Sequence, residues 1–304
     1  MLHFVCMKIA LITGGNTGER EVSLASARTI EQAISFATVE LFVFPEQLQD
    51  FLSVYQEYCL AIPMIHGKGG EDGALQGLLE LLTVPHLFGG VRAHAIGIDK
   101  QLCKNMVSAL GIQVPLSFHH PGIDQGSSKV SYPVFIKSNT GGSSLQMGLC
   151  ENEEDLDVCL SSGIQDPIIE QAISGREFTV GVIEKEGALT ALPVTEIIPR
   201  AHYFDYESKY DVNELAEEVC PALIDDALAC ELQSAAVRIH KELGVQYLSR
   251  SDFIVTTDGE VYFLEINTIP GMTPTSLVPR ALKASGVDLS SLLKYWCNKL
   301  TTNK

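Results

Sequence analysis

The sequence predicts an α/β protein built from two or three compact domains. Its 304 residues exceed one average domain. Hydrophobic residues make up 46% of the chain and charged residues 19%, a balance typical of folded globular proteins. Segments with strand and helix patterns alternate over roughly the first 90 residues, and a long helix followed by a hairpin is predicted in the last third. We expect domain boundaries near residues 90 and 180.

In the N-terminal part, a short apolar run at 8–13 predicts a strand that ends at Gly14-Gly15. Apolar residues at helical spacing then predict a helix over 22–34. Further strands at 39–44 and 60–65 and a helix at 74–82 complete an alternation that favours a parallel sheet.

The middle of the chain predicts a smaller domain. A helix over 99–110 precedes two short strands, 134–137 and 145–149, which surround a glycine-rich tip and predict a hairpin. A helix and two strands follow, at 153–160, 167–171 and 177–183. In the last third, a helix at 227–243 leads to strands at 247–255 and 261–267, which flank the favoured hairpin turn Asp258-Gly259.

Charge and cysteine usage narrow the class of protein. A net charge of −17 argues against nucleic acid or an anionic membrane surface as a partner. The eight cysteines show no metal-binding spacing, so we expect free thiols and a reducing cytoplasm. No apolar run reaches the ~18 residues of a membrane span, and we interpret the apolar start as a strand and not as a signal peptide.

The predicted C-terminal hairpin carries the most informative polar cluster. With a two-residue loop, Asp252 faces Glu265 and Arg250 faces Asn267, so all four share one face. The other face would send a set of apolar side chains to a core: Phe253, Val255, Tyr262, Leu264 and Ile266. Two carboxylates and an amide oxygen suit Mg²⁺. Any two of these residues would be better explained as a solvated strand face, but the four together favour metal–nucleotide binding.

Three loops add weaker signals. The glycine-rich tip at 137–144 suits phosphate binding through backbone N–H groups, although it lacks a Walker A pattern and by itself equally fits a flexible hairpin tip. Glu19, between a strand and a helix, is a candidate ligand-binding carboxylate or simply a partner of the helix dipole. His66 opens a second polar loop on the same sheet edge, where a structural histidine is the plainer interpretation.

These pieces occur in the order typical of one known family. The segments are GGNTGEREVSL (14–24), HGKGGEDGALQG (66–77), DK (99–100), GGSS (141–144), SGREFTV (174–180), FDYESKY (204–210), SRSDF (249–253) and LEINTIPGMTPTSLVP (264–279). Together they resemble the D-alanine–D-alanine ligase family of the ATP-grasp superfamily over roughly residues 8–295. Two stretches depart from the family pattern: Leu145-Gln146 in the phosphate loop, and 86–90, where the family usually has YTGSG.

The resemblance implies a three-domain ATP-grasp fold. Residues 1–90 would form an N-terminal α/β substrate domain with a parallel sheet, followed by a central α+β domain (91–180) and a C-terminal α+β domain (181–304). ATP would lie between the last two. The resemblance also implies a set of ATP-binding residues: Lys100, Lys137, Glu170, Glu177 and Lys209. Asp252, Glu265 and Asn267 would hold two Mg²⁺ ions, with Mn²⁺ as a substitute.

The resemblance further implies substrate and catalytic roles. Glu19 would bind the ammonium of the first D-alanine, and His66 and Arg250 its carboxylate region. The remaining residues would close or complete the site: Ser143 and Tyr210 with Glu19, Ser276 and Leu277 at the second carboxylate, and Gly271 with Arg250 at the oxyanion. We expect the 204–210 segment to act as a lid that excludes water.

The implied activity is ATP-dependent ligation of two D-alanines through an acyl phosphate, which supplies a peptidoglycan precursor, and the implied assembly is a homodimer. Two alternatives remain open. One is an ATP-grasp ligase for another carboxylate and amine or hydroxyl, including D-lactate, although Lys209-Tyr210 favours dipeptide synthesis by resemblance. The other is a nucleotide-binding regulatory module without catalysis, because a fold alone never establishes activity.

Overall fold

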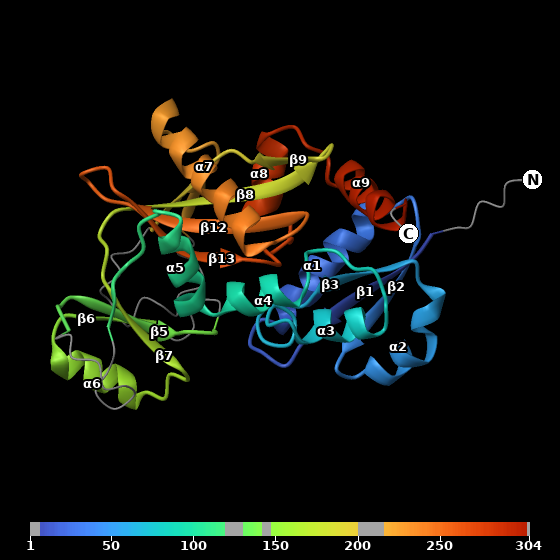
Figure 1. Ribbon diagram of the computed structural model, residues 1–304, viewed down its shortest axis with the longest axis horizontal. Helices are drawn as coiled ribbons and strands as arrows, with labels where there is room; N and C mark the ends of the chain where they lie inside the picture. Colours follow the sequence, from blue (N-terminus) through green and yellow to red (C-terminus); the bar gives the residue numbers. More distant parts are fainter. Residues whose placement is uncertain (1–6, 119–129, 142–146, 200–215, 303–304) are drawn as a thin grey trace, which may run out of the picture.

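Three β-sheets organise the chain, one in each successive part of the sequence (Figure 1). The computed structural model describes residues 7–118, 130–141, 147–199 and 216–302. The first sheet is parallel and the other two are antiparallel. The predicted mixed α/β architecture is therefore confirmed.

The N-terminal sheet has the strand order β2-β1-β3, with β1 (Lys8–Gly14) between β2 (Thr38–Phe44) and β3 (Leu60–Met64). β1 is buried almost throughout, as expected for a parallel strand covered on both faces. The connecting helices are α1 (Arg20–Ala33), α2 (Leu48–Val54), a 3₁₀ turn (Tyr55–Glu57) and α3 (Ala74–Leu81). α2 was not predicted, and it is anchored by Phe51, which is fully buried against the rings of Phe42 and Phe44.

The end of β1 needs a glycine, which leads to a stability prediction. Gly14 has φ +105°, and a Cβ there would collide with the carbonyl oxygen of Phe44, whereas Gly187 has φ +82° and open space around it. We expect Gly187→Ala to cost about 1 kcal/mol through backbone strain alone. Gly14→Ala should cost about 3 kcal/mol or more, because steric overlap adds to the strain. Thermal melting of the two variants tests this, and equal melting temperatures would contradict it.

The central part begins with α4 (Val91–Ile98) and α5 (Lys100–Ala109) and continues into a four-stranded sheet. Its order is β4 (Ser117–Phe118), β7 (Pro167–Gln171), β5 (Val134–Ser138) and β6 (Met147–Cys150). α6 (Glu153–Ser161) supplies Leu156 to the small core beneath it. β5 pairs antiparallel with β6, so the predicted hairpin is confirmed.

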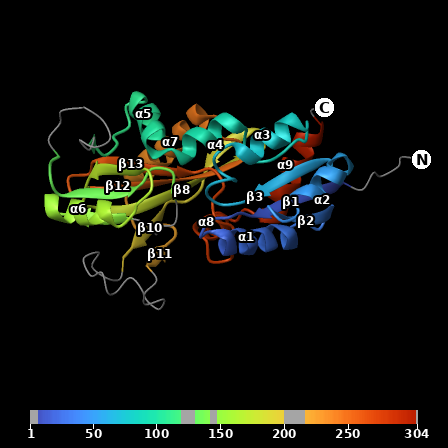
Figure 2. The same ribbon diagram turned by 90° about the horizontal axis from the view of Figure 1, so that it is seen from below.

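The third sheet has the order β11-β10-β8-β12-β13 (Figure 2). β9 pairs with β8 outside this order. Its strands are β8 (Arg176–Lys185), β9 (Ala188–Ala191), β10 (Thr195–Ile198), β11 (Glu217–Val219), β12 (Leu248–Val255) and β13 (Val261–Asn267). α7 (Asp226–Leu243) packs its apolar side against one face. The expected boundary near residue 180 falls inside β8, so this sheet begins a few residues earlier, at Arg176.

The β12–β13 hairpin corrects the predicted turn. Val255 pairs with Val261, and Thr256 and Glu260 bond across the end, so the loop is one residue longer than expected. A β-bulge beside Asp252 then shifts the register back. Asp252 therefore pairs with Glu265 and Arg250 with Asn267, as predicted. Between the bulge and the loop the faces of β13 are exchanged: Val261 and Phe263 are buried, and the prediction that Tyr262 and Leu264 face the core is wrong.

Two C-terminal helices, α8 (Leu277–Ala284) and α9 (Leu289–Thr302), return to the N-terminal unit (Figure 1). Trp296 of α9 is buried against Phe88 and Tyr247, and its indole N–H donates to the carbonyl oxygen of Glu184 at 2.6 Å. One core cluster thus joins the first sheet, the third sheet and the C-terminus. Among the described residues, no helix combines the length and apolar character that crossing a membrane requires.

Candidate active site

The polar face of the third sheet gathers the predicted metal-binding residues. Arg250 donates from Nε and Nη2 to the two oxygens of Asp252, both at 2.9 Å. Asp252 also accepts from Asn267 Nδ2 at 3.1 Å and from Thr179 Oγ1 at 2.5 Å. These residues come from three adjacent strands, β8, β12 and β13. They lie on one face because paired residues in an antiparallel sheet project to the same side. Glu177, two residues before Thr179, lies on this face too.

Glu265 completes the face at its β13 edge. Its carboxylate lies 3.4 Å from Lys100 Nζ, which also donates to the carbonyl oxygen of Gly141 at 2.5 Å. Burial raises the pKa of Glu265, but the charges of Lys100, Lys137 and Arg250 outweigh it, so the net shift is downward. Glu265 is therefore ionised at neutral pH. Lys100 brings the start of α5, β13 and the loop after β5 to one point.

The donor chemistry of this face fits Mg²⁺. Asp252 and Glu265 offer carboxylate oxygens, and Asn267 uses its amide nitrogen toward Asp252, which turns its amide oxygen away from that contact. Mg²⁺ typically binds a few oxygen ligands from the protein, and nucleotide phosphates and water complete its coordination shell. Within the described part of the chain no three His, Cys, Asp or Glu side chains form a metal cluster by themselves.

A buried ion-pair cluster lies on the central sheet. Glu170 of β7 is bound on one oxygen by Lys104 and on the other by Lys137 Nζ, at 2.9 Å. Burial raises the pKa of Glu170, but the two ammonium groups lower it by more than burial raises it, so the pKa is held below its usual range. Sequence reasoning placed Lys137 and Glu170 at the nucleotide and missed Lys104. The structure brings all three together.

The second polar loop, at 66–71, is hydrogen-bonded to the residues that follow β13. The side chain of His66, 5% exposed, has Nδ1 2.8 Å from the carbonyl oxygen of Ile269 and Nε2 3.2 Å from Ser26 Oγ. Glu71 accepts from the N–H groups of Gly67 and Ile269, at 2.9 and 2.7 Å. Burial raises the pKa of Glu71. The loop at 66–71 and the residues after Asn267 thus form one polar junction, in which Glu71 was not predicted.

Glu19 belongs to the same junction. It is the residue before α1, and its side chain does not cap that helix. Its carboxylate instead lies against Gly67, where any side chain would collide with it. Glu19 thus makes no capping hydrogen bond, and its roles as a ligand-binding carboxylate or as a partner of the helix dipole both remain predictions. The N-terminal loop, the loop at 66–71 and the end of β13 converge.

The segment after β13 folds back on itself. Ser276, the residue before α8, shares its hydroxyl with Thr273: the two oxygens lie 2.7 Å apart, and the Thr273 N–H donates to Ser276 Oγ at 3.1 Å. A Cβ at Gly271 would lie 2.9 Å from that same oxygen. Ser276 directly precedes α8 and Leu277 is its first residue. Both therefore lie at a helix N-terminus, where backbone N–H groups favour an anion.

Several predictions fall outside the described residues. Ser143, Lys209, Tyr210 and the 204–210 segment lie there, as do the phosphate-loop residues Leu145-Gln146. Their assigned roles remain predictions.

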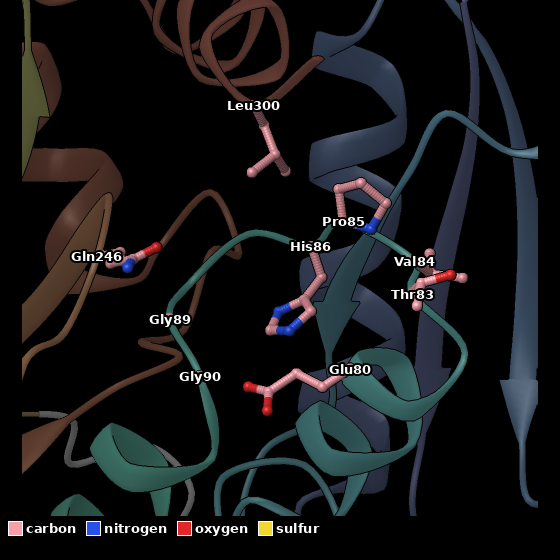
Figure 3. A pocket seen from close by; sticks show the side chains of 9 residues that line it. All are labelled: Glu80, Thr83, Val84, Pro85, His86, Gly89, Gly90, Gln246 and Leu300. Atoms are coloured by element: carbon pink, nitrogen blue, oxygen red, sulfur yellow. The ribbon is translucent and has the colours of Figure 1, made fainter. Parts of the chain in front are cut away.

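A separate hollow lies where the N-terminal unit meets the third sheet (Figure 3). It is lined by Glu80, residues 83–86, Gly89, Gly90, Gln246 and Leu300. None of these is a predicted site residue. We place the chemistry at the polar face and its junction, because the ionised groups converge there.

Comparison with known proteins identifies the family. A family model described as the D-alanine–D-alanine ligase C-terminus matches residues 118–297, more than half of the chain. The D-alanine–D-alanine ligase of Halalkalibacterium halodurans is 36% identical, with 96% of this chain and 98% of that protein covered. The chain belongs to the D-alanine–D-alanine ligase family. A second ligase of the family, from Desulfotalea psychrophila, is 38% identical over 94% of this chain and 92% of that protein.

Solved structures agree with the family assignment and confirm the ATP-grasp fold. The D-alanine–D-alanine ligase of Bacillus anthracis has a TM-score of 0.84 at 27% identity, with 98% of both chains covered. A D-Ala:D-Ser ligase from Enterococcus faecalis has a TM-score of 0.81 at 29% identity, covering 97% of this chain and 99% of that one. The B. anthracis ligase complexed with ATP has a TM-score of 0.81 at 25% identity, with 98% of both chains covered.

Proposed function

We propose that this chain joins two D-alanines to D-alanyl-D-alanine with ATP, forming ADP and phosphate. The observation that carries the proposal is the junction of two sites. The oxygen-rich face of Asp252, Glu265 and Asn267 continues directly into Ile269, which His66 and Glu71 fasten to the N-terminal loops. A phosphate-handling face and a loop suited to an amino acid are thereby side by side, as ligation through a phosphorylated intermediate requires.

The first step activates the first substrate. A carboxylate is anionic and lacks a leaving group, so the γ-phosphoryl group of ATP is transferred to it and an acyl phosphate forms. Lys100 and Lys137 place positive charge at the phosphates, and Glu177 and Glu170 contact the rest of the nucleotide. Asp252, Glu265 and Asn267 would hold Mg²⁺, which neutralises phosphate charge when bound. Glu19 orients the first D-alanine by its ammonium group, with His66 beside its carboxylate.

The second step forms the peptide bond. The neutral amine of the second D-alanine attacks the acyl phosphate, and negative charge develops on the carbonyl oxygen. Arg250, fixed by its two bonds to Asp252, and the Gly271 N–H stabilise that oxygen by about 3 kcal/mol or more per donor. Ser276 and Leu277 receive the second carboxylate. Phosphate leaves and the dipeptide remains; Ser143 and Tyr210 close the site with Glu19, and Lys209 reaches the phosphates.

Further features extend the proposal. The enzyme uses two Mg²⁺ ions, for which Mn²⁺ can substitute, and acts as a homodimer that supplies peptidoglycan precursor. It works in the cytoplasm, which is supported by the seven cysteines in the described residues, all of them free. We assign the three domains to residues 1–90, 91–180 and 181–304, although β8 of the third sheet already starts at Arg176.

The direct test is phosphate release from Mg·ATP with candidate acceptors side by side. D-Alanine should support release, and L-alanine and D-lactate should support little. D-Serine belongs in the panel because a D-Ala:D-Ser ligase shares the fold. ATP binding without any amino-acid-dependent phosphate release would overturn the ligase assignment in favour of a regulatory module.

Acceptor choice should depend on pH in a definite direction. An amine attacks only when deprotonated, whereas the hydroxyl of D-lactate does not titrate in the working range. With D-alanine and D-lactate in competition, we expect dipeptide to predominate and to increase relative to ester from about pH 6 to about pH 9. Mass spectrometry of both products measures the ratio. Ester as the main product at about pH 8 would assign the chain to a D-lactate-using branch instead.

A further inference from the structure

Lys104 links two parts of the molecule through a buried contact. It lies one helical turn after Lys100 on the buried side of α5. Its neighbours Cys103 and Val107 pack into the core beneath the third sheet, whereas its own ammonium reaches Glu170 on β7 of the central sheet. The α5 helix is thus packed in the core of the third sheet while its Lys104 binds Glu170 of the central sheet (Figure 1).

Glu170 is shared between two lysines. Lys104 takes Oε1 and Lys137 takes Oε2. Burial lowers the pKa of Lys104 to about 8, as does the nearby charge of Lys137, against the opposing effect of Glu170. The second nearby carboxylate, Glu265, pairs with Lys100. Three ammonium groups therefore stand against two carboxylates, and the excess positive charge suits an anionic ligand.

Exposure separates Lys104 from its neighbours. Its side chain is 1% exposed, against 16% for Lys137 and 8% for Lys100. A phosphate oxygen can approach Lys137 from solvent, whereas the Lys104 ammonium is buried against Glu170. Lys104 therefore acts on a nucleotide without touching it, through the Glu170 carboxylate that it holds and through its charge.

Removing Lys104 would change how strongly the Lys137 ammonium can bind a phosphate. The whole charge of Glu170 would then attract Lys137, because a buried carboxylate cannot stay without a partner. Lys137 would be held more closely to Glu170 and would donate less to a phosphate. The cluster would also lose one positive charge. Both changes weaken binding of an anionic ligand.

We propose that Lys104 is a positioning residue: by holding one oxygen of Glu170, it fixes the carboxylate whose other oxygen sets the Lys137 ammonium at the nucleotide. The proposal rests on the proposed function in that Lys137 contacts ATP phosphates. It adds a residue that touches no substrate and yet determines how tightly the nucleotide binds.

The test compares Lys104→Met with Lys299→Met in the full chain. Lys299 also pairs with a carboxylate, Glu184, but outside the site, so it controls for loss of a lysine ion pair. Calorimetry with a non-hydrolysable ATP analogue and Mg²⁺ should show about 10- to 100-fold weaker binding for Lys104→Met. Lys299→Met should stay within about 2-fold of wild type. The KM for ATP should rise likewise, and the KM for D-alanine should change less than about 3-fold.

Lys104→Gln guards against a folding defect. Glutamine keeps a hydrogen-bond donor for Glu170 without the charge, so it should bind the analogue with an affinity between those of wild type and Lys104→Met. Unchanged analogue affinity in both variants, with only a lower melting temperature, would overturn the proposal and leave Lys104 a structural residue. Equal rises in the KM for ATP and for D-alanine would also overturn it. Absence of D-alanine-dependent phosphate release by the wild type would refute the ligase function, while the analogue affinities would still decide the role of Lys104.

Discussion

Glu265→Gln is expected to lower kcat at least about 100-fold while the protein keeps its fold. Glutamine has nearly the same shape, but it lacks the charge that pairs with a metal ion. The neighbouring lysines and Arg250 hold the pKa of Glu265 down against burial, so the native group is a carboxylate at neutral pH. The substitution therefore removes a charged ligand without making a cavity. Turnover and thermal melting measure the two halves of this prediction.

A matched control separates metal binding from ion-pair loss. Glu184 of β8 pairs with Lys299 outside the site, so Glu184→Gln makes the same chemical change and should leave kcat within about 2-fold. Glu265→Gln should also need more Mg²⁺ for half-maximal activity. Near-normal turnover of Glu265→Gln with an unchanged melting curve and Mg²⁺ requirement would remove Glu265 from the metal site.

The polar face could be predicted because its residues are close in sequence. Arg250, Asp252, Glu265 and Asn267 belong to one hairpin, so period-two alternation and a short turn place them together. The loop is one residue longer than predicted, and the bulge beside Asp252 compensates for it. The pairs at the far end of the hairpin were therefore correct, whereas the core assignments of Tyr262 and Leu264 were not. A bulge leaves no signal in alternation alone.

The other contacts of the site are too distant in sequence to predict. Lys104 and Glu170 are 66 residues apart, and Glu71 and Ile269 are 198 apart. The helical spacing from Lys100 to Lys104 predicts a shared face, but it does not name the partner. For Glu71, the signal was its place in the HGKGGEDG loop, which sequence reasoning left unassigned.

The edges of the fold were missed for a different reason. β10 and β11 have four and three residues, too few for an alternating pattern to be distinguished from a loop. α8 and α9 bury their apolar sides against the N-terminal unit and the third sheet, and their position depends on contacts with chain segments far from them in sequence. Sequence pattern gave the sheets and their principal helices, and tertiary packing determined the rest.

Arg250→Lys should abolish most activity although the positive charge is kept. Arginine holds both oxygens of Asp252 with two parallel bonds of 2.9 Å, which fixes the plane of its guanidinium and the direction of its remaining N–H groups. Lysine is a point charge on a flexible stem and cannot reproduce that fork. If Arg250 donates to the oxyanion, kcat should fall about 100- to 1,000-fold, and the KM for ATP should change little.

The chain offers a geometric control for this substitution. Arg176 of β8 makes the same two-bond contact with Glu196, at 2.7 and 2.8 Å. It projects from the face of β8 opposite to Glu177 and is more exposed to solvent than Arg250. Arg176→Lys loses an equivalent fork and should retain kcat within about 2-fold. Asp252 keeps its bonds from Thr179 and Asn267 in Arg250→Lys, so the two variants should melt within a few degrees of each other. Arg250→Lys with activity within about 3-fold of wild type would show that charge alone suffices and that the fixed guanidinium does not stabilise the oxyanion.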